Sequence, residues 1–229
     1  MREFYQPYGV INYPFGSTGA QMGGWFRKEI KTVEDLKGLK MRIGGFAGQV
    51  MVKLGVVPQQ IAAGEIYPAL EKGTIDAAEW VGPYDDERLG LQKVAPFYHY
   101  PGWWEGTAYG SLYIGQKAWD SLPPLYRSAI ETSAADASQW TTAKYDAENP
   151  AALRRLIAGG AKLVAFPRPV LEACYHAAQE LYVETSAKNA KFKKVYDHWR
   201  AFRDEQYLWF RVAEQSFDNF VYSMQARTR

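Results

Sequence analysis

The pattern of apolar and polar positions divides the chain into a mixed first half and a helical second half. Short apolar or alternating runs between Gly and Pro predict strands, and apolar residues three or four apart predict helices. In the first half this pattern predicts strands at 8–15, 39–43, 56–60, 74–78 and 108–114, and helices at 48–54, 64–72 and 83–92. Alternating strands and helices of this kind are typical of an α/β architecture.

After Lys117 the pattern becomes almost entirely helical. Helices are predicted at 123–149, 151–158, 169–188 and 191–222, with Pro150 kinking or restarting the first of them and one further strand at 161–166. The last helix is unusually long and rich in aromatic residues. Because the strands are few for the amount of apolar helix, we expect that part of a sheet is missing.

Composition excludes several classes of protein. The chain has 229 residues, of which 47% are hydrophobic and 23% charged, as in ordinary globular proteins. Its net charge of +2 is spread over interspersed acids and bases, so we expect no nucleic-acid partner. No apolar run approaches the ~20 residues that span a bilayer. The first residues lack the basic and apolar regions of an export signal, so we expect none in this chain.

The cysteine and the histidines predict no chemistry of their own. Cys174 is the only cysteine of the sequence and lies in a helical run, where we expect a small buried side chain rather than a nucleophile. The three histidines, at positions 99, 176 and 198, have no spacing that suggests zinc, and we interpret them as structural.

A first candidate site lies in the stretch 73–86, GTIDAAEWVGPYDD. Glu79 and Trp80 follow the predicted strand 74–78 and precede the breaker Gly82-Pro83. In open α/β sheets ligands bind beyond the carboxyl ends of the strands, so this acid and aromatic ring are candidates for a binding site. A surface glutamate beside a core tryptophan explains the same residues equally well.

Three further segments offer groups that could face a ligand. Arg42 lies inside an apolar strand, where a guanidinium needs a carboxylate partner from the protein or from a ligand. A structural salt bridge is the slightly favoured interpretation from this segment alone. Gln21 follows the turn after the first strand, and Glu105 follows the aromatic pair at 103–104.

These residue types suggest two kinds of chemistry. Gln21, Glu79 and Glu105 are hard oxygen donors, which suit Na⁺ or Ca²⁺. Arg42 offers a planar fork for a carboxylate, so a small organic acid could be held by Arg42 and by a cation that bridges it to the acids. Alternatively, two acids in an aromatic pocket could form the pair of a carboxylate enzyme such as a glycoside hydrolase. A purely structural, helix-pairing fragment is a third hypothesis.

Three segments together carry a resemblance to a known family. They are LKGLKMRIGGFAG, GEIYPALEKGTIDAAEWVGPYDD and YHYPGWWEG. The combination resembles the extracytoplasmic substrate-binding proteins of tripartite ATP-independent periplasmic (TRAP) transporters, in the group that binds 2-oxo acids and related monocarboxylates. The resemblance runs from about Tyr8 to the C-terminal helix.

The resemblance implies a periplasmic-binding-protein-like fold of two lobes that close on a ligand. Such proteins are not enzymes: they work in the periplasm and deliver a small organic acid, such as pyruvate or lactate, to the membrane subunits of the transporter. By this resemblance Arg42 would bind the carboxylate of the acid, and the Trp80 ring would line the pocket. Gln21, Glu79, the backbone carbonyl of Trp80 and Glu105 would hold Na⁺ or Ca²⁺ against the substrate.

The resemblance also implies how the chain divides. Residues 1–115 would form most of the ligand-binding α/β lobe with the crossover strands. Residues 116–229 would supply long helices and one strand that complete the second lobe, and a C-terminal helix of the kind that can pair two protomers into a homodimer. Members of the family begin with a signal peptide and several βα units before the strand that matches 8–15. We therefore expect a partial two-lobe fold that starts near the crossover between the lobes.

Overall fold

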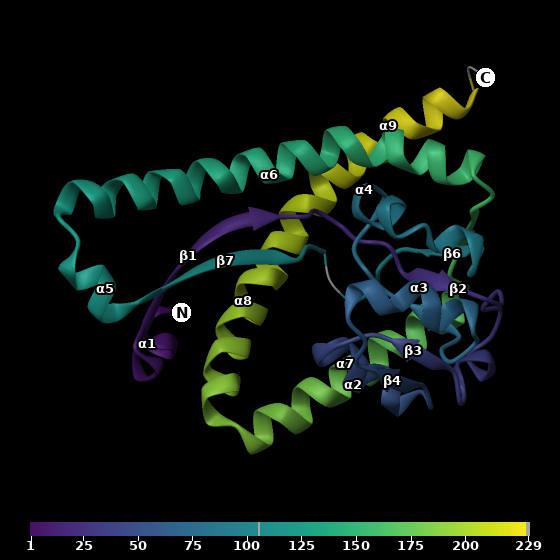
Figure 1. The fold of residues 1–229 in the computed structure, drawn as a ribbon, viewed down its shortest axis with the longest axis horizontal. Helices are drawn as coiled ribbons and strands as arrows, with labels where there is room; N and C mark the ends of the chain where they lie inside the picture. The colour runs from purple at the N-terminus through teal and green to yellow at the C-terminus, as the bar shows by residue number, and fades with distance from the viewer. Residues whose placement is uncertain (105, 228–229) are drawn as a thin grey trace. The chain divides into compact units, whose positions relative to one another are not determined.

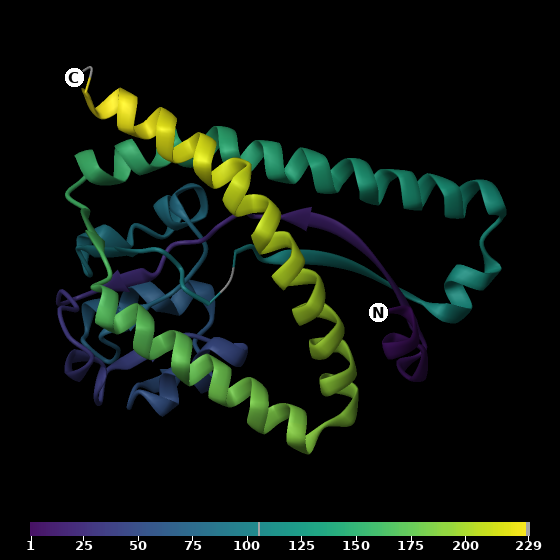
Figure 2. The same ribbon diagram turned by 180° about the vertical axis from the view of Figure 1, so that it is seen from behind.

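The computed structural model describes residues 1–104 and 106–227, and its contacts divide the chain into two compact units, Met1–Gln179 and Glu180–Arg229. Strands and helices of the first unit are mixed, and the second unit is helical (Figures 1 and 2). The predicted α/β class is therefore confirmed. The predicted division into 1–115 and 116–229 concerns lobes rather than these units and stays a prediction.

The main sheet of the first unit carries the candidate site. In the described part of the chain its strands lie in the order β4 (Val57–Gln59), β3 (Lys40–Arg42), β5 (Ala77–Ala78), β2 (Gly24–Phe26), β6 (Phe97–Tyr100) and β8 (Lys162–Ala165). Strand β3 is parallel to both of its neighbours, and β2 is antiparallel to β5 and β6. Since β3 and β5 run in the same direction, their carboxyl ends meet at one edge of the sheet.

Each face of this sheet has its own apolar core. Successive side chains of a strand point to opposite faces, and Trp25 and Phe26 accordingly belong to different clusters. Helices α2 (Gly45–Lys53) and α3 (Ala63–Glu71) precede β4 and β5, and the short α4 (Pro83–Asp86), η3 (Glu87–Leu89) and η4 (Leu91–Lys93) follow β5. The predicted helices at 48–54 and 64–72 are confirmed.

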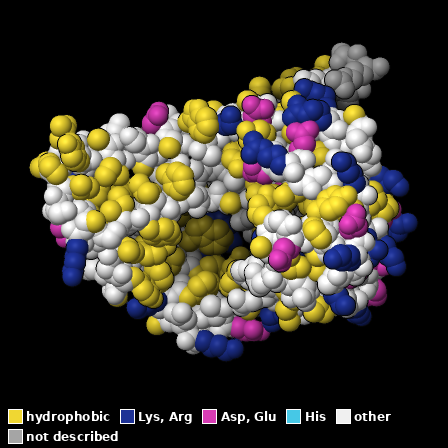
Figure 3. Space-filling model, in the orientation of Figure 1, with side chains coloured by type: hydrophobic (Ala, Val, Ile, Leu, Met, Phe, Trp, Pro, Cys, Tyr) yellow, Lys and Arg dark blue, Asp and Glu magenta, His cyan; other side chains and the backbone are white. Residues whose placement is uncertain are grey.

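A second, two-stranded sheet completes the first unit together with a long helix. Strands β1 (Val10–Ser17) and β7 (Tyr109–Gly115) pair antiparallel after the short α1 (Arg2–Tyr5) and η1 (Gln6–Tyr8). Helices α5 (Gln116–Ser121) and α6 (Pro124–Ala158) follow, and α6 runs along the pair of strands (Figure 1). Tyr13 and Trp119 form a small core there with Ala134 of α6. Hydrophobic side chains also gather on the outside of β7 and α5 (Figure 3), where Tyr109 and Tyr113 are exposed.

The second unit holds the end of α7 (Arg168–Lys188), α8 (Ala190–Val212) and α9 (Glu214–Arg227). Tyr182 of α7 and Tyr196 of α8 stack with ring centroids 4.9 Å apart. The prediction of one helix over 191–222 was wrong, because the chain leaves helical geometry at Ala213 (φ −85°, ψ −92°). The Ser216 hydroxyl donates to the carbonyls of Val212 and Ala213. These side-chain hydrogen bonds compete with the backbone hydrogen bonds of a continuous helix at this point.

Two other predicted elements differ from the structure. The helix predicted at 83–92 is three short pieces, and Gly90 between the last two has a left-handed φ of +65°. Helix α6 continues through Pro150 without interruption, where the sequence predicts a kink or a restart. The short central strand β2 was not predicted at all. The remaining predicted strands and helices are confirmed with ends shifted by a few residues.

Candidate functional site

The backbone pairing of β3 and β5 brings Arg42 beside Glu79. Arg42 is the last residue of β3 and lies opposite Ala78, the last residue of β5. The Glu79 N–H then donates to the Arg42 carbonyl at 2.9 Å and extends the pairing by one residue. Met41 and Ala77, which lie opposite each other one position earlier, are fully buried, so the apolar core of the sheet fixes this register.

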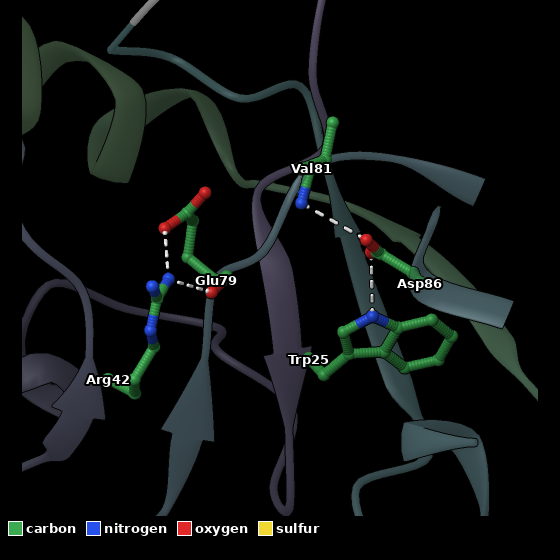
Figure 4. A network of polar contacts seen from close by, with 5 residues as sticks. All are labelled: Trp25, Arg42, Glu79, Val81 and Asp86. Atoms are coloured by element: carbon green, nitrogen blue, oxygen red, sulfur yellow. Dashed lines mark hydrogen bonds and ion pairs between the residues drawn. The ribbon is translucent and has the colours of Figure 1, made fainter. Parts of the chain in front are cut away.

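The side chain of Arg42 binds Glu79 twice (Figure 4). Its Nη1 donates to the Glu79 carbonyl at 2.6 Å and to Glu79 Oε2 at 3.0 Å. The guanidinium carbon also lies 5.0 Å from the centre of the Trp80 ring, within the range of a cation–π contact. The structure thus gives Arg42 a carboxylate partner from the protein. Among the described residues both hydrogen bonds of the guanidinium use Nη1, so Nε and Nη2 can still bind a second carboxylate side-on.

Gln21 lies in the segment next to the turn that contains Glu79 and Trp80. The backbone carbonyl oxygen of Gln21 accepts from the Gly102 N–H at 2.8 Å, and the N–H of Met22 donates to the Val81 carbonyl at 3.1 Å. A side chain at position 102 would put its Cβ 2.8 Å from the Gln21 carbonyl oxygen, so this close approach of two backbone segments requires glycine.

The side-chain amide of Gln21 has one satisfied end and one unsatisfied end. Its Nε2 donates to Thr18 Oγ1 at 3.2 Å, whereas Oε1 is buried and has no hydrogen-bond partner among the described residues. A buried acceptor without a partner costs roughly 1–3 kcal/mol of stability. A bound cation would satisfy this oxygen, because amide carbonyls are ordinary ligands of Na⁺ and Ca²⁺.

The candidate ligand atoms fit a hard cation better than a transition metal. They are Gln21 Oε1, the Glu79 carboxylate and the Trp80 carbonyl, all of them oxygen atoms. In the described part of the chain no three His, Cys, Asp or Glu side chains gather in a metal-type group, so a cation here would depend on the amide and the backbone carbonyl. The fourth predicted ligand, Glu105, lies outside the described residues.

A buried carboxylate next to this turn was missed by the sequence analysis. Asp86 is fully buried, and its Oδ2 accepts from Trp25 Nε1 at 2.9 Å and from the Tyr98 hydroxyl at 2.7 Å. Its Oδ1 accepts from the Val81 N–H at 3.0 Å (Figure 4). Burial raises the pKa of Asp86 to about 6, while the three hydrogen bonds act in the opposite direction.

The sequence contains no signal that distinguishes Asp86 from its neighbour Asp85. Both acids lie in the first turn of α4, where an acid is usually exposed and favoured by the helix dipole. Only packing separates them: Asp85 accepts from the Tyr145 hydroxyl of α6 at 2.6 Å, whereas Asp86 turns into the core.

Helix α6 fixes the segment that follows the turn. The Asn149 Oδ1 accepts from the Tyr84 N–H at 3.0 Å, and Arg155 binds both carboxylate oxygens of Glu87 at 2.7 and 2.8 Å. The Arg155 hydrogen bond lowers the pKa of Glu87. The backbone after Trp80 is therefore held by the core on one side and by α6 on the other.

Cys174 and His99 are core residues, as the sequence analysis predicts. Cys174 is completely buried, and burial raises the pKa of its thiol to about 12. His99 is also completely buried between Phe26 and Phe166, and its Nε2 accepts from the Ile30 N–H at 3.2 Å. Burial lowers the pKa of His99 to about 4, so its imidazole is neutral at physiological pH.

Comparison with known proteins places the chain in a family. Residues 3–189 match the model of the bacterial extracellular solute-binding proteins, family 7. The monocarboxylate 2-oxoacid-binding periplasmic protein of Nostoc sp. is 51% identical over 225 residues, which are 98% of this chain and 62% of that protein. The chain thus spans about three fifths of the length of this curated relative.

Two solved structures of TRAP solute-binding proteins are similar in fold. That of Bordetella bronchiseptica is 55% identical with a TM-score of 0.96, over all of this chain and 68% of the other, and is described as a mixed-occupancy dimer with calcium and picolinate in one site. That of Pseudoalteromonas atlantica, with bound sodium and pyruvate, is 43% identical with a TM-score of 0.90, over 95% of this chain and 66% of the other. The chain belongs to family 7 of the bacterial extracellular solute-binding proteins, the substrate-binding proteins of TRAP transporters.

Proposed function

We propose that this chain captures a small monocarboxylate, a 2-oxo acid such as pyruvate or else lactate, with a bridging Na⁺ or Ca²⁺. In the periplasm it would deliver the acid to the membrane subunits of a TRAP transporter. The observation that carries the proposal is the Arg42 guanidinium, which keeps one edge of its fork available between Glu79 and Trp80 at the carboxyl end of the sheet. The alternative of a carboxylate-pair enzyme has no support, because the family consists of transporter binding proteins.

The proposed binding mode follows from the charges at the site. Arg42 would bind the carboxylate of the acid through Nε and Nη2 and keep Glu79 on Nη1, so its single positive charge would face two carboxylates. A cation would offset the remaining repulsion, and Gln21, Glu79, Glu105 and the carbonyl of Trp80 are the groups that we propose hold it. The Trp80 ring would cover the apolar part of the acid. All these residues lie within 1–115, the part predicted to form most of one ligand-binding lobe.

Two similar proteins support this combination of ligands. The Pseudoalteromonas protein holds sodium and pyruvate, and the Bordetella protein holds calcium and picolinate. The Nostoc relative is named for binding monocarboxylate 2-oxoacids. No described helix is both long and apolar enough to cross a membrane.

We also propose that the C-terminal helices pair two copies of the chain. Large aromatic side chains on α8 and α9 are exposed: Trp199, Phe202, Trp209, Phe217 and Phe220. Exposed aromatic side chains that gather on neighbouring helices are typical of a protein–protein interface. The Bordetella structure is described as a dimer, which supports a homodimer without identifying its interface. Light scattering checks this assignment. The unmodified chain should have the mass of a dimer, and Trp209→Lys should have the mass of a monomer. A Trp209→Lys variant that keeps the mass of a dimer would show that Trp209 does not contribute to the interface.

Calorimetric titration with pyruvate tests the binding function. We expect binding in buffer with Na⁺ or Ca²⁺ and a large loss in sodium-free buffer with a chelator. Arg42→Lys keeps the charge but loses the fork, and should weaken binding by about 1.5–3 kcal/mol, the range for charged hydrogen bonds. The exposed Arg154→Lys is the matched control and should bind like the unmodified chain. Equal affinity of Arg42→Lys and the control, or binding that ignores the cation, would contradict the proposal.

A further inference from the structure

The carboxylate of Asp86 binds the same peptide group whose carbonyl oxygen is a proposed cation ligand. Its Oδ1 accepts from the Val81 N–H at 3.0 Å, and that nitrogen is bonded to the carbonyl carbon of Trp80. Among the described residues the only cis peptide bond is Tyr100–Pro101, so the peptide between Trp80 and Val81 is trans. In a planar trans peptide the N–H and the C=O point in opposite directions. The Trp80 carbonyl therefore faces away from Asp86.

We infer that Asp86 is a positioning residue for the proposed cation site, which it serves by fixing and polarising the peptide between Trp80 and Val81. The inference rests on the proposed function, since the Trp80 carbonyl matters only where a cation binds. A negative charge on the N–H side of a peptide strengthens the dipole of its C=O group, and this makes the oxygen a better ligand for a cation.

The hydrogen bonds of Asp86 favour an ionised carboxylate. Trp25 Nε1 and the Tyr98 hydroxyl both donate to Oδ2, and the Val81 N–H donates to Oδ1. The Trp25 and Val81 N–H groups can only donate, so a protonated acid could give its hydrogen only to the Tyr98 hydroxyl, which would then have to accept instead of donate. The ionised form accepts from all three groups and places a negative charge on the inner side of the turn.

The same turn is held on its other side by the segment that contains Gln21. The Val81 carbonyl accepts from the Met22 N–H at 3.1 Å, so both polar groups of the Val81 backbone have fixed partners. The residue after Gln21 is thereby bonded to the residue after Trp80. Asp86 consequently sets the orientation of the Trp80 carbonyl and contributes to the placement of Gln21, the two proposed ligands on either side of this contact.

A pair of variants separates this role from a general contribution to folding. In Asp86→Asn the single amide oxygen can face either the donor pair of Trp25 and Tyr98 or the Val81 N–H. Facing the pair turns the NH₂ group against the Val81 N–H and breaks that bond. Tyr98→Phe is the matched control, because it removes one hydrogen bond to Oδ2 and leaves the bond from Val81 intact.

Two measurements compare these variants with the unmodified chain. The first is amide hydrogen exchange of Val81 in the ligand-free protein, which should be at least tenfold faster in Asp86→Asn than in Tyr98→Phe. The second is calorimetric titration of calcium chloride or sodium chloride in the presence of pyruvate, in which Asp86→Asn should weaken cation affinity at least fivefold. The thermal midpoints should fall by similar amounts in the two variants.

Equal Val81 exchange in the two variants, or a cation affinity of Asp86→Asn that matches the control, would overturn the inference. An unmodified chain that shows no cation-dependent binding of pyruvate would overturn the proposed function instead, and the exchange of Val81 would still decide whether Asp86 holds the peptide. Should Asp86→Asn not fold, the unmodified protein decides: slow exchange of the Val81 amide is expected, and exchange as fast as that of an unstructured amide refutes the assignment.

Discussion

The buried imidazole of His99 should make the stability of the protein depend on pH. Burial lowers the pKa of His99 to about 4, from an ordinary value of 6.5. On acidification the imidazole of His99 is protonated at a higher pH in the unfolded chain than in the folded chain. The contribution of the neutral imidazole to stability is therefore complete above pH 6.5. It is lost as the pH falls towards 4. From these two pKa values, the loss between pH 7.5 and pH 4.5 is about 2.5 kcal/mol.

Asp86 opposes this effect over almost the same range. Burial raises the pKa of Asp86 from 3.8 to about 6, so the folded chain binds this proton more tightly than the unfolded chain. The contribution of Asp86 to stability is complete below pH 3.8 and is lost as the pH rises through 6. On acidification from pH 7.5 to pH 4.5, the contribution of Asp86 to the unfolding free energy therefore rises by about 2 kcal/mol. The opposite effects of His99 and Asp86 on stability nearly cancel in the unmodified chain.

His99→Gln exposes this compensation. Glutamine removes the titrating ring and keeps an acceptor for the Ile30 N–H, which His99 binds through Nε2. We expect the change in unfolding free energy from pH 7.5 to pH 4.5 to be more favourable in His99→Gln than in the unmodified chain by about 2.5 kcal/mol. Urea unfolding at both pH values measures it, with the exposed His176→Gln as control. If the unfolding free energy changes by the same amount between the two pH values in all three proteins, the conclusion that His99 is buried and neutral is refuted.

Three further predictions concern other buried or paired groups. Gln21→Met removes the buried oxygen without a partner, so it should abolish cation-dependent pyruvate binding while its urea-unfolding free energy falls by less than about 1 kcal/mol. A loss of stability without a loss of binding would contradict this. The Cys174 thiol should react with iodoacetamide only on the timescale of unfolding, because burial raises its pKa to about 12; rapid labelling of the folded chain would show an accessible thiolate. Glu87→Gln should leave the urea-unfolding free energy nearly unchanged, because its partner Arg155 is largely exposed, and a clear loss of stability would indicate a wider ion-pair network.

The sequence predicts the two strands that carry the site but not what brings them together. Its local pattern places Arg42 within the predicted strand 39–43 and Glu79 directly after the predicted strand 74–78. Their contact depends on the parallel register of β3 and β5, which is set by burial of Met41 and Ala77 in the core. The sequence shows that a carboxylate must accompany Arg42, and the structure shows that this carboxylate is Glu79.

The central strand β2 was missed because its sequence resembles a loop. It follows Gly23 and begins at Gly24, whose φ of +107° lies in the left-handed region. A Cβ on Gly24 would lie 2.8 Å from the carbonyl oxygen of Ala78, so glycine is required for the close approach of β2 to β5. Local pattern marks such glycines as breakers, whereas here they allow a strand to enter the middle of a crowded sheet.

Two buried polar groups near the site lower the stability of the fold. An ionised Asp86 in the core lowers stability at neutral pH by about 3 kcal/mol relative to its protonated form. The unsatisfied Gln21 oxygen costs roughly 1–3 kcal/mol more. The Val81 backbone bonds to Asp86 and to Met22, the residue that follows Gln21. A marginally stable protein gains nothing in folding from two such costs, whereas the cation that we propose at Gln21 and Trp80 would make use of both groups.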